Sequence, residues 1–396
     1  MNVRREIILV TGSSGYLGYP IAERLSESYA VVGFDRRQPS HPGPGTECLY
    51  VDLTSESSLR RGLQTVRELH GERLACVIHL AAYYDFSGLA SPLYERVTVR
   101  GTARLLRLLR EMFTVEQFIF SSTMLVHAPT TPGHPISEDS PLDPTWAYPL
   151  SKVETEKIIH SERGDIPSVI LRIAGVFDDL GHSMPLPRQM QRIFEHDLTG
   201  HVFPGNLDHG QAMVHRDDVV DLYELLVAAR DALPAELTLL VAEPETLSYG
   251  EMQRTLGDLI HGETWKTRKI PKPLAKLGAW AQQTLPLGVT PFFKPWMIDR
   301  ADDHFEVDIS RARKSVDWEP KRSLRESLPD IVAALKADPW AWYRENDLEM
   351  PRWLREVAPR PTTAGMLPLG LHDILPSGSQ ALDIGRIQET VLGAQS

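Results

Sequence analysis

Residues 6–35, EIILVTGSSGYLGYPIAERLSESYAVVGFD, decide the fold of this chain. Residues 6–11 form a short apolar run rich in β-branched side chains, which is typical of a strand buried on both faces. A glycine-rich turn follows, and apolar residues then recur with helical spacing at Leu17, Ile21 and Leu25. The run YAVVGFD at residues 29–35 has the pattern of a second strand. Strand, helix and strand within about 30 residues predict a βαβ unit with a right-handed crossover.

The same alternation continues along the chain. Strand-like runs occur at residues 48–53, 73–82, 117–123 and 168–177, and helical patterns separate them at 58–70, 101–113 and 153–164. Repeated alternation of this kind predicts an α/β fold with a Rossmann-type doubly wound parallel sheet and helices on both faces. We assign this Rossmann-type domain to residues 1–175.

After residue 175 the elements become shorter, with a predicted helix at 214–230, a strand at 237–243 and a helix at 248–260. Residues 176–335 are interpreted as a smaller C-terminal substrate lobe that is interleaved with the ends of the sheet. Residues 336–396 are predicted to be a C-terminal extension. Within it we expect an amphipathic docking helix near 339–346 and a loosely ordered tail at 376–396.

Composition limits the classes of partner. The 396 residues carry a formal net charge of −11, which argues against nucleic acid because phosphate binding needs a concentrated basic face. The two cysteines, Cys48 and Cys76, both flank strand-like runs, so we expect buried, unpaired thiols in a reducing compartment. The sequence shows no signal-peptide pattern and no apolar stretch long enough to span a membrane. We therefore expect a cytoplasmic protein, and we predict no metal site.

The turn after the first predicted strand reads TGSSGYLG, residues 11–18. Exposed N–H groups and the positive dipole at a helix start suit an anionic phosphate. Gly12 and Gly15 allow a sharp turn close to a pyrophosphate, and Gly18 lets the helix lie against the strand. Because the motif lies between a strand and a helix, it favours a dinucleotide site over a tight turn without a ligand. The predicted contact residues are Gly12, Ser14, Gly15, Tyr16, Leu17 and Gly18.

Two acidic positions at strand ends bear on which dinucleotide binds. Asp35 ends the second predicted strand, where a carboxylate can accept from both ribose hydroxyls of NAD and repels the 2′-phosphate of NADP. Arg36 and Arg37 favour NADP, because guanidinium groups bind a 2′-phosphate. We predict NAD and leave NADP open, with a solvated turn as the alternative for this segment. Asp52 and Leu53 are predicted to lie near the adenine, or else to belong to the N-cap region of the next helix.

The second motif is YPLSK at residues 148–152. Tyr148 and Lys152 are one helical turn apart and therefore share a face. A free phenol has a pKa of about 10, and a nearby ammonium together with a cationic nicotinamide would favour the phenolate. Ser121, Ser122 and Thr123 end the preceding strand, where a hydroxyl can hold a substrate oxygen. We predict Thr123, Tyr148 and Lys152 as catalytic; the alternatives are an exposed helical pair and a capped strand end.

These residues resemble the extended short-chain dehydrogenases/reductases, the NAD-dependent epimerase/dehydratase group, over residues 5–335. TGSSGYLG is similar to the nucleotide loop of that family, FSST at 120–123 to its hydroxyl-bearing strand and YPLSK to its Tyr–Lys pair. Further landmarks are MVHRDDVVD, PETLSYGEMQ and DISRARKSVDWEP. HLAA is similar to the fourth-strand cofactor contact, which implies contacts from Leu80, Ala81 and Ala82.

The resemblance also implies roles for the predicted catalytic residues. Tyr148 would be the acid/base, Lys152 would bind the ribose and tune the tyrosine, and Thr123 would orient the substrate. Family members often dimerise through the two helices that begin near Gly101 and Tyr148, so a homodimer is expected.

Departures from the family pattern narrow the function. Thr98 stands where the family usually has Asn, and ML at 124–125 replaces the Asp-Glu pair of the nucleotide-sugar 4,6-dehydratases. An Asn and an Arg of the sugar-nucleotide epimerases correspond to Gly175 and Gln211 here. Because a diphosphate needs cationic partners, these changes weaken the sugar-nucleotide interpretation, although Arg300 can match a second diphosphate arginine.

The apolar segment at 269–297 is bracketed by prolines and contains a possible helical stripe followed by aromatic residues. These residues are Leu274, Leu277, Ala281, Leu285, Phe292, Phe293 and Trp296. Three interpretations stay open: a lid helix over the core, an apolar wall for a hydrophobic substrate, and weak peripheral membrane contact. Similar segments occur in the branch that resembles 3β-hydroxysteroid dehydrogenases and dihydroflavonol reductases. The run YYDF at 83–86 is predicted to border the cleft, as a stacking surface or as ordinary packing.

We predict an NAD(P)-dependent oxidoreductase that interconverts a secondary alcohol and a ketone of a small-molecule substrate by hydride transfer, with Tyr148 handling the proton. The alternative is an NAD-dependent epimerase of a (nucleotide-)sugar, which keeps its NAD tightly bound and shows no net redox. A non-catalytic nucleotide-binding scaffold is the third interpretation, and the intact Thr, Tyr and Lys set argues against it. The fold alone does not decide among these.

Overall fold

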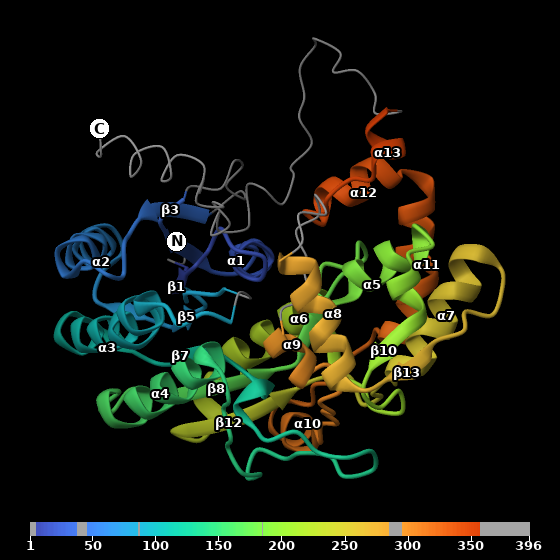
Figure 1. Cartoon of the computed structure of the whole chain (residues 1–396). Helices are drawn as coiled ribbons and strands as arrows, with labels where there is room; N and C mark the ends of the chain where they lie inside the picture. The colour runs from blue at the N-terminus through green and yellow to red at the C-terminus, as the bar shows by residue number, and fades with distance from the viewer. Residues whose placement is uncertain (1–4, 38–45, 86–87, 184, 285–294, 357–396) are drawn as a thin grey trace, which may run out of the picture.

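The computed structural model describes residues 5–37, 46–85, 88–183, 185–284 and 295–356. Its centre is a seven-stranded sheet with the order β12-β8-β7-β5-β1-β2-β3, in which every neighbouring pair is parallel (Figure 1). The strands are β1 (Ile7–Thr11), β2 (Ala30–Asp35), β3 (Thr46–Tyr50), β5 (Cys76–His79), β7 (Phe118–Thr123), β8 (Ser168–Ile173) and β12 (Glu236–Val241). The strand order reverses between β1 and β5, and ligands of such sheets bind beyond the carboxyl ends of the strands at this point.

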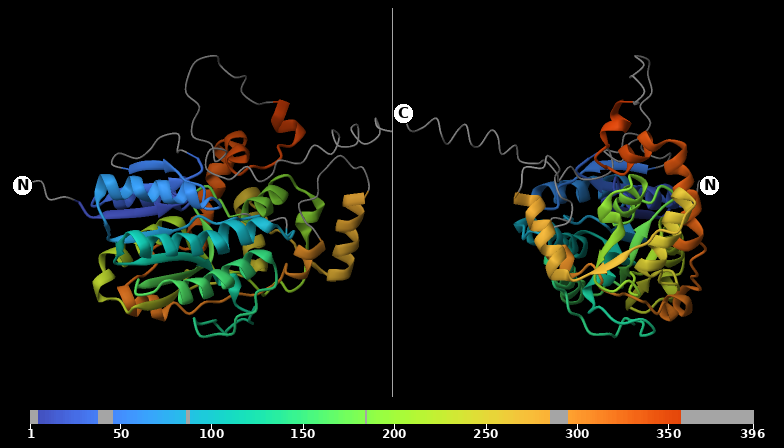
Figure 2. Two further views of the ribbon diagram at one scale, coloured as in Figure 1. Left: turned by 90° about the vertical axis from the view of Figure 1, so that its left-hand side faces the viewer. Right: turned by 45° about the vertical axis from the view of Figure 1, so that its right-hand side comes forward.

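Helices cover both faces of the sheet (Figures 1 and 2). One face carries α1 (Gly18–Ser26) and α6 (Arg216–Ala228), and the other carries α2 (Glu56–His70), α3 (Arg100–Met112) and α4 (Ala147–Glu162). Successive side chains of a strand point to opposite faces. Ile8 and Val10 of β1 therefore join the core beneath α1 and α6, whereas Ile7 and Leu9 join the core on the opposite side. The predicted Rossmann-type fold is confirmed.

A smaller lobe packs beside the sheet around a third core cluster that includes Phe177. Its helices are α5 (Pro185–Phe194), α7 (Tyr249–His261), α11 (Leu324–Ala337) and α12 (Pro339–Glu345). Trp342 and Tyr343 of α12 are buried in this cluster, which confirms the predicted docking helix. Sheet and lobe are interleaved, because α6 and β12 of the sheet region lie in the sequence between α5 and α7 of the lobe.

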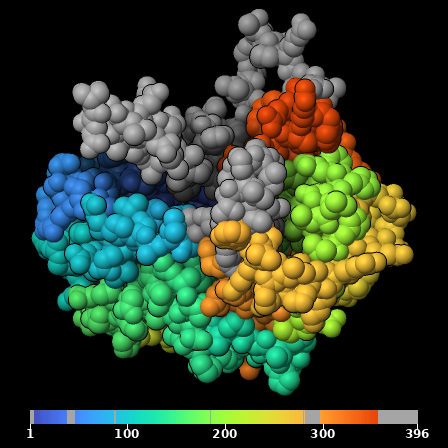
Figure 3. Space-filling model, viewed as in Figure 1, coloured from blue at the N-terminus to red at the C-terminus, as the bar shows by residue number. Residues whose placement is uncertain are grey.

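The remaining elements are short or peripheral. The strands are β4 (Arg73–Leu74), β6 (Thr114–Val115), β9 (Gly175–Phe177), β10 (Val202–Pro204), β11 (Met213–His215) and β13 (Arg268–Ile270). The helices and turns are η1 (Tyr94–Val99), η2 (Met124–Val126), η3 (Leu198–His201), η4 (Arg230–Ala232), α8 (Lys272–Thr284), α9 (Pro295–Asp299), α10 (Ser310–Val316) and α13 (Arg352–Glu356). The helix α8 lies on the face of the molecule shown in Figure 3.

The structure moves two predicted boundaries. The predicted strand at 168–177 is two strands, β8 and β9, because Gly175 leaves the central sheet and pairs with Met213 of β11. For the same reason the helix predicted at 214–230 begins only at Arg216.

Both cysteines are free, as predicted, but they differ in burial. Cys76 is fully buried, whereas Cys48 is only half-buried because β3 is an edge strand of the sheet. The tail predicted at 376–396 lies outside the described residues. Within the described ranges, no helix has both the length and the apolar character needed to cross a membrane.

Candidate active site

The glycine loop connects β1 to α1 and can be built only with glycine at two positions. Gly12 has a φ of +73°, and a Cβ there would lie 2.9 Å from the Ala81 nitrogen. A Cβ on Gly18 would lie 2.0 Å from the Gly12 carbonyl oxygen. The loop is therefore a shallow cradle at the start of a helix, which fits the pyrophosphate of a dinucleotide.

The polar residues of this loop bond to the end of β2. The Ser14 amide donates to Asp35 Oδ2 at 3.0 Å, and the Arg37 amide donates to Asp35 Oδ1 at 3.0 Å. Ser14 Oγ donates to the Arg37 carbonyl oxygen at 2.9 Å. Asp35 is thus brought to the loop, as a ribose-binding carboxylate requires. Arg36 is exposed beside it.

Tyr16 and Leu17 of the predicted cofactor set also make contacts within the protein. Tyr16 packs against the start of α6, with the Arg216 guanidinium carbon 5.4 Å from its ring centroid, and burial raises the pKa of its phenol. Leu17 packs against the core cluster beneath α1. Gly15 accepts from the Tyr19 amide at 3.0 Å through its carbonyl and so belongs to the first turn of α1.

Asp52 and Leu53 stand where the alternative interpretation placed them, next to the start of α2. Asp52 Oδ1 accepts from both the amide and the hydroxyl of Thr54 at 2.8 Å, while Ser55 caps the helix. Leu53 is buried in the core beneath α3. These contacts match the capping interpretation, and the adenine contact of the two residues stays a prediction.

The end of β5 is fastened to the glycine loop through a buried histidine. His79 Nδ1 lies 2.7 Å from Thr11 Oγ1, and His79 Nε2 lies 2.8 Å from Thr102 Oγ1. Burial, and to a smaller extent Lys152, lowers the pKa of His79 to about 3, so the ring is neutral. The Ala81 amide donates to Thr11 Oγ1 at 3.3 Å. Leu80, Ala81 and Ala82 follow directly, partly exposed beside the glycine loop.

Thr98, at the position where the family usually has asparagine, hydrogen-bonds two neighbouring segments of the chain. Thr98 Oγ1 accepts from the Tyr83 amide at 3.0 Å, and its carbonyl oxygen accepts from Thr102 Oγ1 at 2.6 Å. The residue is fully buried in η1, a π-helical turn, and such turns are frequent at functional sites.

Thr123, Tyr148 and Lys152 converge from two elements. Thr123 ends β7, and its hydroxyl is near enough to Tyr148, at the first turn of α4, to lower the pKa of that phenol. Lys152 Nζ donates to the Ser121 carbonyl oxygen at 2.7 Å and lies 5.7 Å from the centroid of the Tyr148 ring. The predicted catalytic residues are therefore neighbours in space, with Lys152 buried behind the tyrosine.

Burial controls the protonation of this group. It raises the pKa of Tyr148 well above its usual range, and the Thr123 hydroxyl opposes this only in part. Burial also lowers the pKa of Lys152 to about 7, with Glu156 acting in the opposite direction. The protein's own residues thus favour the protonated phenol of Tyr148. The predicted phenolate depends on a cationic nicotinamide as well and stays a prediction.

A buried ion pair behind the catalytic residues was not predicted. Glu156 accepts from Ser122 Oγ at 2.5 Å and from Arg172 Nη2 at 2.8 Å. Arg172 Nη1 contacts His127 Nε2 at 3.1 Å. The sequence feature that could have predicted it is the position of Glu156, which lies four residues, or one helical turn, after Lys152 and therefore on the same face of the helix.

Aromatic rings surround Tyr148. Tyr84 meets it edge-on at 4.9 Å between ring centroids, and Trp146 lies 5.4 Å away. Trp296 continues the row, 5.5 Å from Trp146. Tyr83 instead packs against Tyr94 at 4.8 Å. Of the predicted aromatic run, Tyr84 is therefore a contact of Tyr148 and Tyr83 is packing, while Phe86 lies outside the described residues.

A cavity of about 410 Å³ begins at this aromatic row and extends between the sheet and the smaller lobe. Much of its wall is apolar, with contributions from Leu125, Trp146, Phe203, Ile270, Leu274 and Trp296. Ligand pockets of this size and character take small molecules. The cavity therefore has a largely apolar wall that reaches Trp146, the ring neighbour of Tyr148.

Helix α8 forms part of this cavity. Leu274, Ala275 and Gly278 line the cavity. The side chains of Leu274, Leu277 and Trp280 are nevertheless largely exposed to solvent, at 58%, 60% and 57%. A lid over the protein core is therefore wrong for the described part of the stripe, because these side chains are not buried. Leu285, Phe292, Phe293 and the side chain of Ala281 lie outside the described residues.

The model of the NAD-dependent epimerase/dehydratase family matches residues 8–242. This chain belongs to that family. It is an enzyme of a group whose members are NAD-dependent dehydrogenases, epimerases and dehydratases, as the sequence predicted.

Relatives in this family have different activities. The chain is 26% identical to human 3β-hydroxysteroid dehydrogenase type 7, over 84% of this chain and 96% of the relative. It is 24% identical to UDP-glucose 4-epimerase from Vibrio cholerae, over 83% and 94%. A solved structure of UDP-glucuronic acid 4-epimerase from Bacillus cereus, in complex with UDP-glucuronic acid and NAD, has a TM-score of 0.62 at 19% identity, covering 84% and 99%. This last likeness shows the shared fold.

Three positions of this chain bear on the sugar-nucleotide interpretation, and two of them, Gly175 and Gln211, differ from the pattern of the epimerases. A Cβ on Gly175 would lie 2.6 Å from Met213 Sδ, so a side chain there would require the Met213 side chain to move. Gln211 lines the cavity and is uncharged. Arg300 also lines the cavity, but it donates to Asp303 Oδ2 at 3.1 Å. The cavity thus presents little free positive charge near these positions to a diphosphate.

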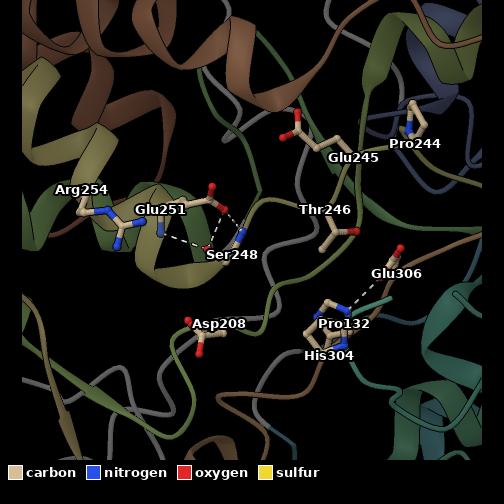
Figure 4. A pocket seen from close by; sticks show the side chains of 10 residues that line it. All are labelled: Pro132, Asp208, Pro244, Glu245, Thr246, Ser248, Glu251, Arg254, His304 and Glu306. Carbon is tan, nitrogen blue, oxygen red and sulfur yellow. Dashed lines mark hydrogen bonds and ion pairs between the residues drawn. The ribbon is translucent and has the colours of Figure 1, made fainter. Parts of the chain in front are cut away.

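A second hollow of about 570 Å³ is polar and lies away from the catalytic residues (Figure 4). Ser248 and Glu251 of its wall form the capping box of α7, and His304 Nε2 lies 3.6 Å from Glu306. Its polar groups thus serve the local fold. Within the described residues, no cluster of His, Cys, Asp and Glu is arranged to hold a metal ion.

Proposed function

We propose that this enzyme is an NAD(P)-dependent dehydrogenase that interconverts a secondary alcohol and a ketone. The observation that carries the proposal is the largely apolar cavity lined by Trp146, whose ring centroid lies 5.4 Å from that of Tyr148. The similarity to human 3β-hydroxysteroid dehydrogenase type 7 over most of both chains supports it.

The residues of the chain divide the chemistry among them. NAD, when bound, supplies the hydride acceptor or donor at its nicotinamide ring. In the direction of reduction, neutral Tyr148 donates its phenolic proton to the carbonyl oxygen of the substrate, and in oxidation it takes that proton back. Thr123 hydrogen-bonds the same oxygen and orients it, while Lys152 stabilises the phenolate that forms after donation.

The glycine loop and the strand ends beside it would hold the cofactor. We assign the pyrophosphate to Gly12, Ser14, Gly15 and Gly18, and the ribose to Asp35. Leu80, Ala81 and Ala82 would flank the nicotinamide half, and Lys152 the second ribose. Tyr16, Leu17, Arg36, Asp52 and Leu53 would border the site. The proposal includes NADP as a cofactor, because Arg36 and Arg37 would bind its 2′-phosphate.

The proposal also includes the domain organisation, the oligomeric state and the compartment. The domains would divide at residues 175 and 335, as the sequence pattern predicts. A homodimer would pair α3 and α4 of two chains, and the protein would act in the cytoplasm. Size-exclusion chromatography with light scattering tests the dimer, and a mass of one chain would contradict it.

An NAD-dependent epimerase is the second candidate. It is favoured by the similarity to UDP-glucose 4-epimerase and by the position of Arg300 in the cavity wall. Gly175 and Gln211 oppose it, because neither can bind a diphosphate oxygen through a positive charge.

Cofactor retention separates the two candidates. Native mass spectrometry and absorbance of the purified protein report whether a nicotinamide cofactor co-purifies with each subunit. The dehydrogenase is expected to release its cofactor and to form NADH in the steady state with apolar secondary alcohols. Tightly held NAD, with conversion of a UDP-sugar and no net NADH, would establish the epimerase instead. Failure to bind either dinucleotide would refute both.

A further inference from the structure

We propose that the cavity beside Tyr148 selects an amphipathic substrate, in which an apolar body carries an anionic oxygen group that Arg192 and Gln189 bind. The proposal rests on the proposed function and names its substrate class. This class is an apolar secondary alcohol or ketone with a carboxylate or phosphate remote from the reacting carbon.

Both residues lie on one face of α5. Pro185, Gln189 and Arg192 follow the helical i, i+4, i+7 spacing, and all three line the cavity. Leu186 and Met190 occupy another face of the same helix and are buried in the core of the smaller lobe. The packing of α5 therefore fixes the direction in which Gln189 and Arg192 point.

Arg192 brings a positive charge to an apolar wall. Burial lowers the pKa of its guanidinium to about 10, so it stays protonated at neutral pH, while the exposed Asp197 acts in the opposite direction. Val202 and Phe203 line the same cavity. A desolvated guanidinium interacts strongly with an anionic oxygen, because little water competes for its donors.

Gln189 adds uncharged donors to the same face. Its side chain is 93% buried, since only 7% of its surface is exposed. Within the described residues its Nε2 is buried and makes no hydrogen bond. Buried amide groups are nearly always hydrogen-bonded in folded proteins. An oxygen-rich group of the substrate would meet this need at the position beside Arg192.

The other charged side chains that line the cavity are less suited to bind an anion than Arg192 and Gln189. Arg300 and Asp303 bond to each other at 3.1 Å, and Asp143 is exposed to solvent. The opposite wall, at Leu125 and Trp146, belongs to the elements that carry Thr123 and Tyr148. The reacting carbon would therefore lie at the Trp146 wall, and the anionic group at α5.

Matched substrates test the inference. A 3-hydroxysteroid with a side-chain carboxylate is compared with its methyl ester, its primary amide and a phosphate-bearing apolar alcohol. We expect kcat/KM for the acid to exceed that for the ester by roughly 10- to 100-fold, the value of a charge-assisted hydrogen bond. Preference for the acid over the phosphate identifies a carboxylate site, and the reverse order identifies a phosphate site.

Variants of α5 assign the effect to its residues. Arg192→Met is expected to remove the preference for the acid, because kcat/KM falls more for the acid than for the ester. Gln189→Met is expected to reduce the preference several-fold. Arg188→Met is the matched control, because Arg188 lies on α5 but outside the cavity wall. Circular dichroism confirms that each variant folds. Equal kcat/KM for acid and ester in the natural enzyme would overturn the inference while leaving the dehydrogenase standing.

Direct binding separates this inference from the proposed function. Titration calorimetry measures binding of the acid and the ester without turnover, in the natural protein and in Arg192→Met. Binding of the acid that depends on Arg192, with no redox activity, would sink the proposed dehydrogenase but keep the anion site. Equal binding of acid and ester would overturn the anion site. Preferential binding of a UDP-sugar, unaffected by Arg192→Met, would also overturn it.

Discussion

At the scale of single residues, burial sets where the reaction proton resides. It raises the pKa of Tyr148 and lowers that of Lys152 to about 7, so both groups shift toward their neutral forms. A neutral phenol held by Thr123 is a proton donor, as reduction of a ketone requires. Tyr148 is therefore protonated, and able to donate its proton, before negative charge develops on the carbonyl oxygen of the substrate.

Tyr148→Phe removes this proton and should lower kcat by roughly 100-fold or more, the usual contribution of a general acid. Binding of the dinucleotide should change little, because the glycine loop, Asp35 and Lys152 that would hold it are unchanged in this variant. Steady-state kinetics and a fluorescence titration with NADH measure the two effects. Normal turnover in this variant would contradict the role of Tyr148.

Asp35→Ala tests the assignment of the ribose. The variant loses the carboxylate that accepts from the Ser14 amide and should bind NAD more weakly while gaining relative affinity for NADP. Dissociation constants of both dinucleotides give the ratio, and Arg36→Ala is the control that should move the ratio the other way. An unchanged ratio would remove Asp35 from the ribose.

At the scale of elements, α4 carries more than the predicted pair. Tyr148, Lys152 and Glu156 follow at four-residue spacing, and Glu156 ties the helix to Ser122 of β7 and Arg172 of β8. The helix can therefore hold Tyr148 against Thr123 only while this buried contact persists. Glu156 is a positioning residue, and it also favours the protonated form of Lys152.

Glu156→Gln should lower the free energy of unfolding by about 3 kcal/mol, because Arg172 stays buried without its carboxylate. It should also lower the pKa of Lys152, so the part of the pH–rate profile that depends on the ammonium moves to lower pH. Denaturant unfolding and the pH dependence of kcat measure the two effects. An unshifted profile would leave Glu156 with a structural role alone.

The control for this variant is Glu154→Gln. Glu154 lies on the same helix but is exposed and pairs with Lys157 at 2.7 Å. Exposed pairs of this kind contribute little. We expect its unfolding free energy to change by less than about 0.5 kcal/mol and its pH profile to stay in place.

At the scale of the whole molecule, a buried carboxyl links the sheet to the C-terminal helices. Glu243 follows β12, is 3% exposed and accepts from the Leu324 amide at the start of α11 at 2.7 Å. Burial raises its pKa to about 8, and the hydrogen bond from Leu324 acts in the opposite direction. The native state thus keeps a proton that the unfolded chain releases near pH 4.

The stability that this proton confers is complete at acid pH and is lost as pH rises toward about 8, with a slope of up to about 1.4 kcal/mol per pH unit. Glu243→Gln should remove that slope and make the protein more stable than the natural chain above this pH. Urea unfolding from about pH 5 to pH 9 measures the difference. Glu95→Gln, at an exposed pair with Arg100, is the control that should keep the slope.

The sequence by itself determined the sheet, the glycine loop and the Thr123, Tyr148 and Lys152 set, because each depends on local spacing. Hydrophobic period and turn residues act over a few positions, so they can be read along the chain. The sequence did not predict the element boundaries at Gly175 and Arg216, because β9 pairs with β11 and these two strands are distant in the chain.

Only the tertiary structure decided what surrounds those residues. Glu156 meets Arg172 across two elements, and Gln189 and Arg192 gain their meaning from the cavity that α5 faces. Likewise, the protonation of Tyr148 depends on how much water the assembled aromatic row excludes. Burial and cavities are properties of surfaces brought together in three dimensions, and the local spacing of residues along a chain does not encode them.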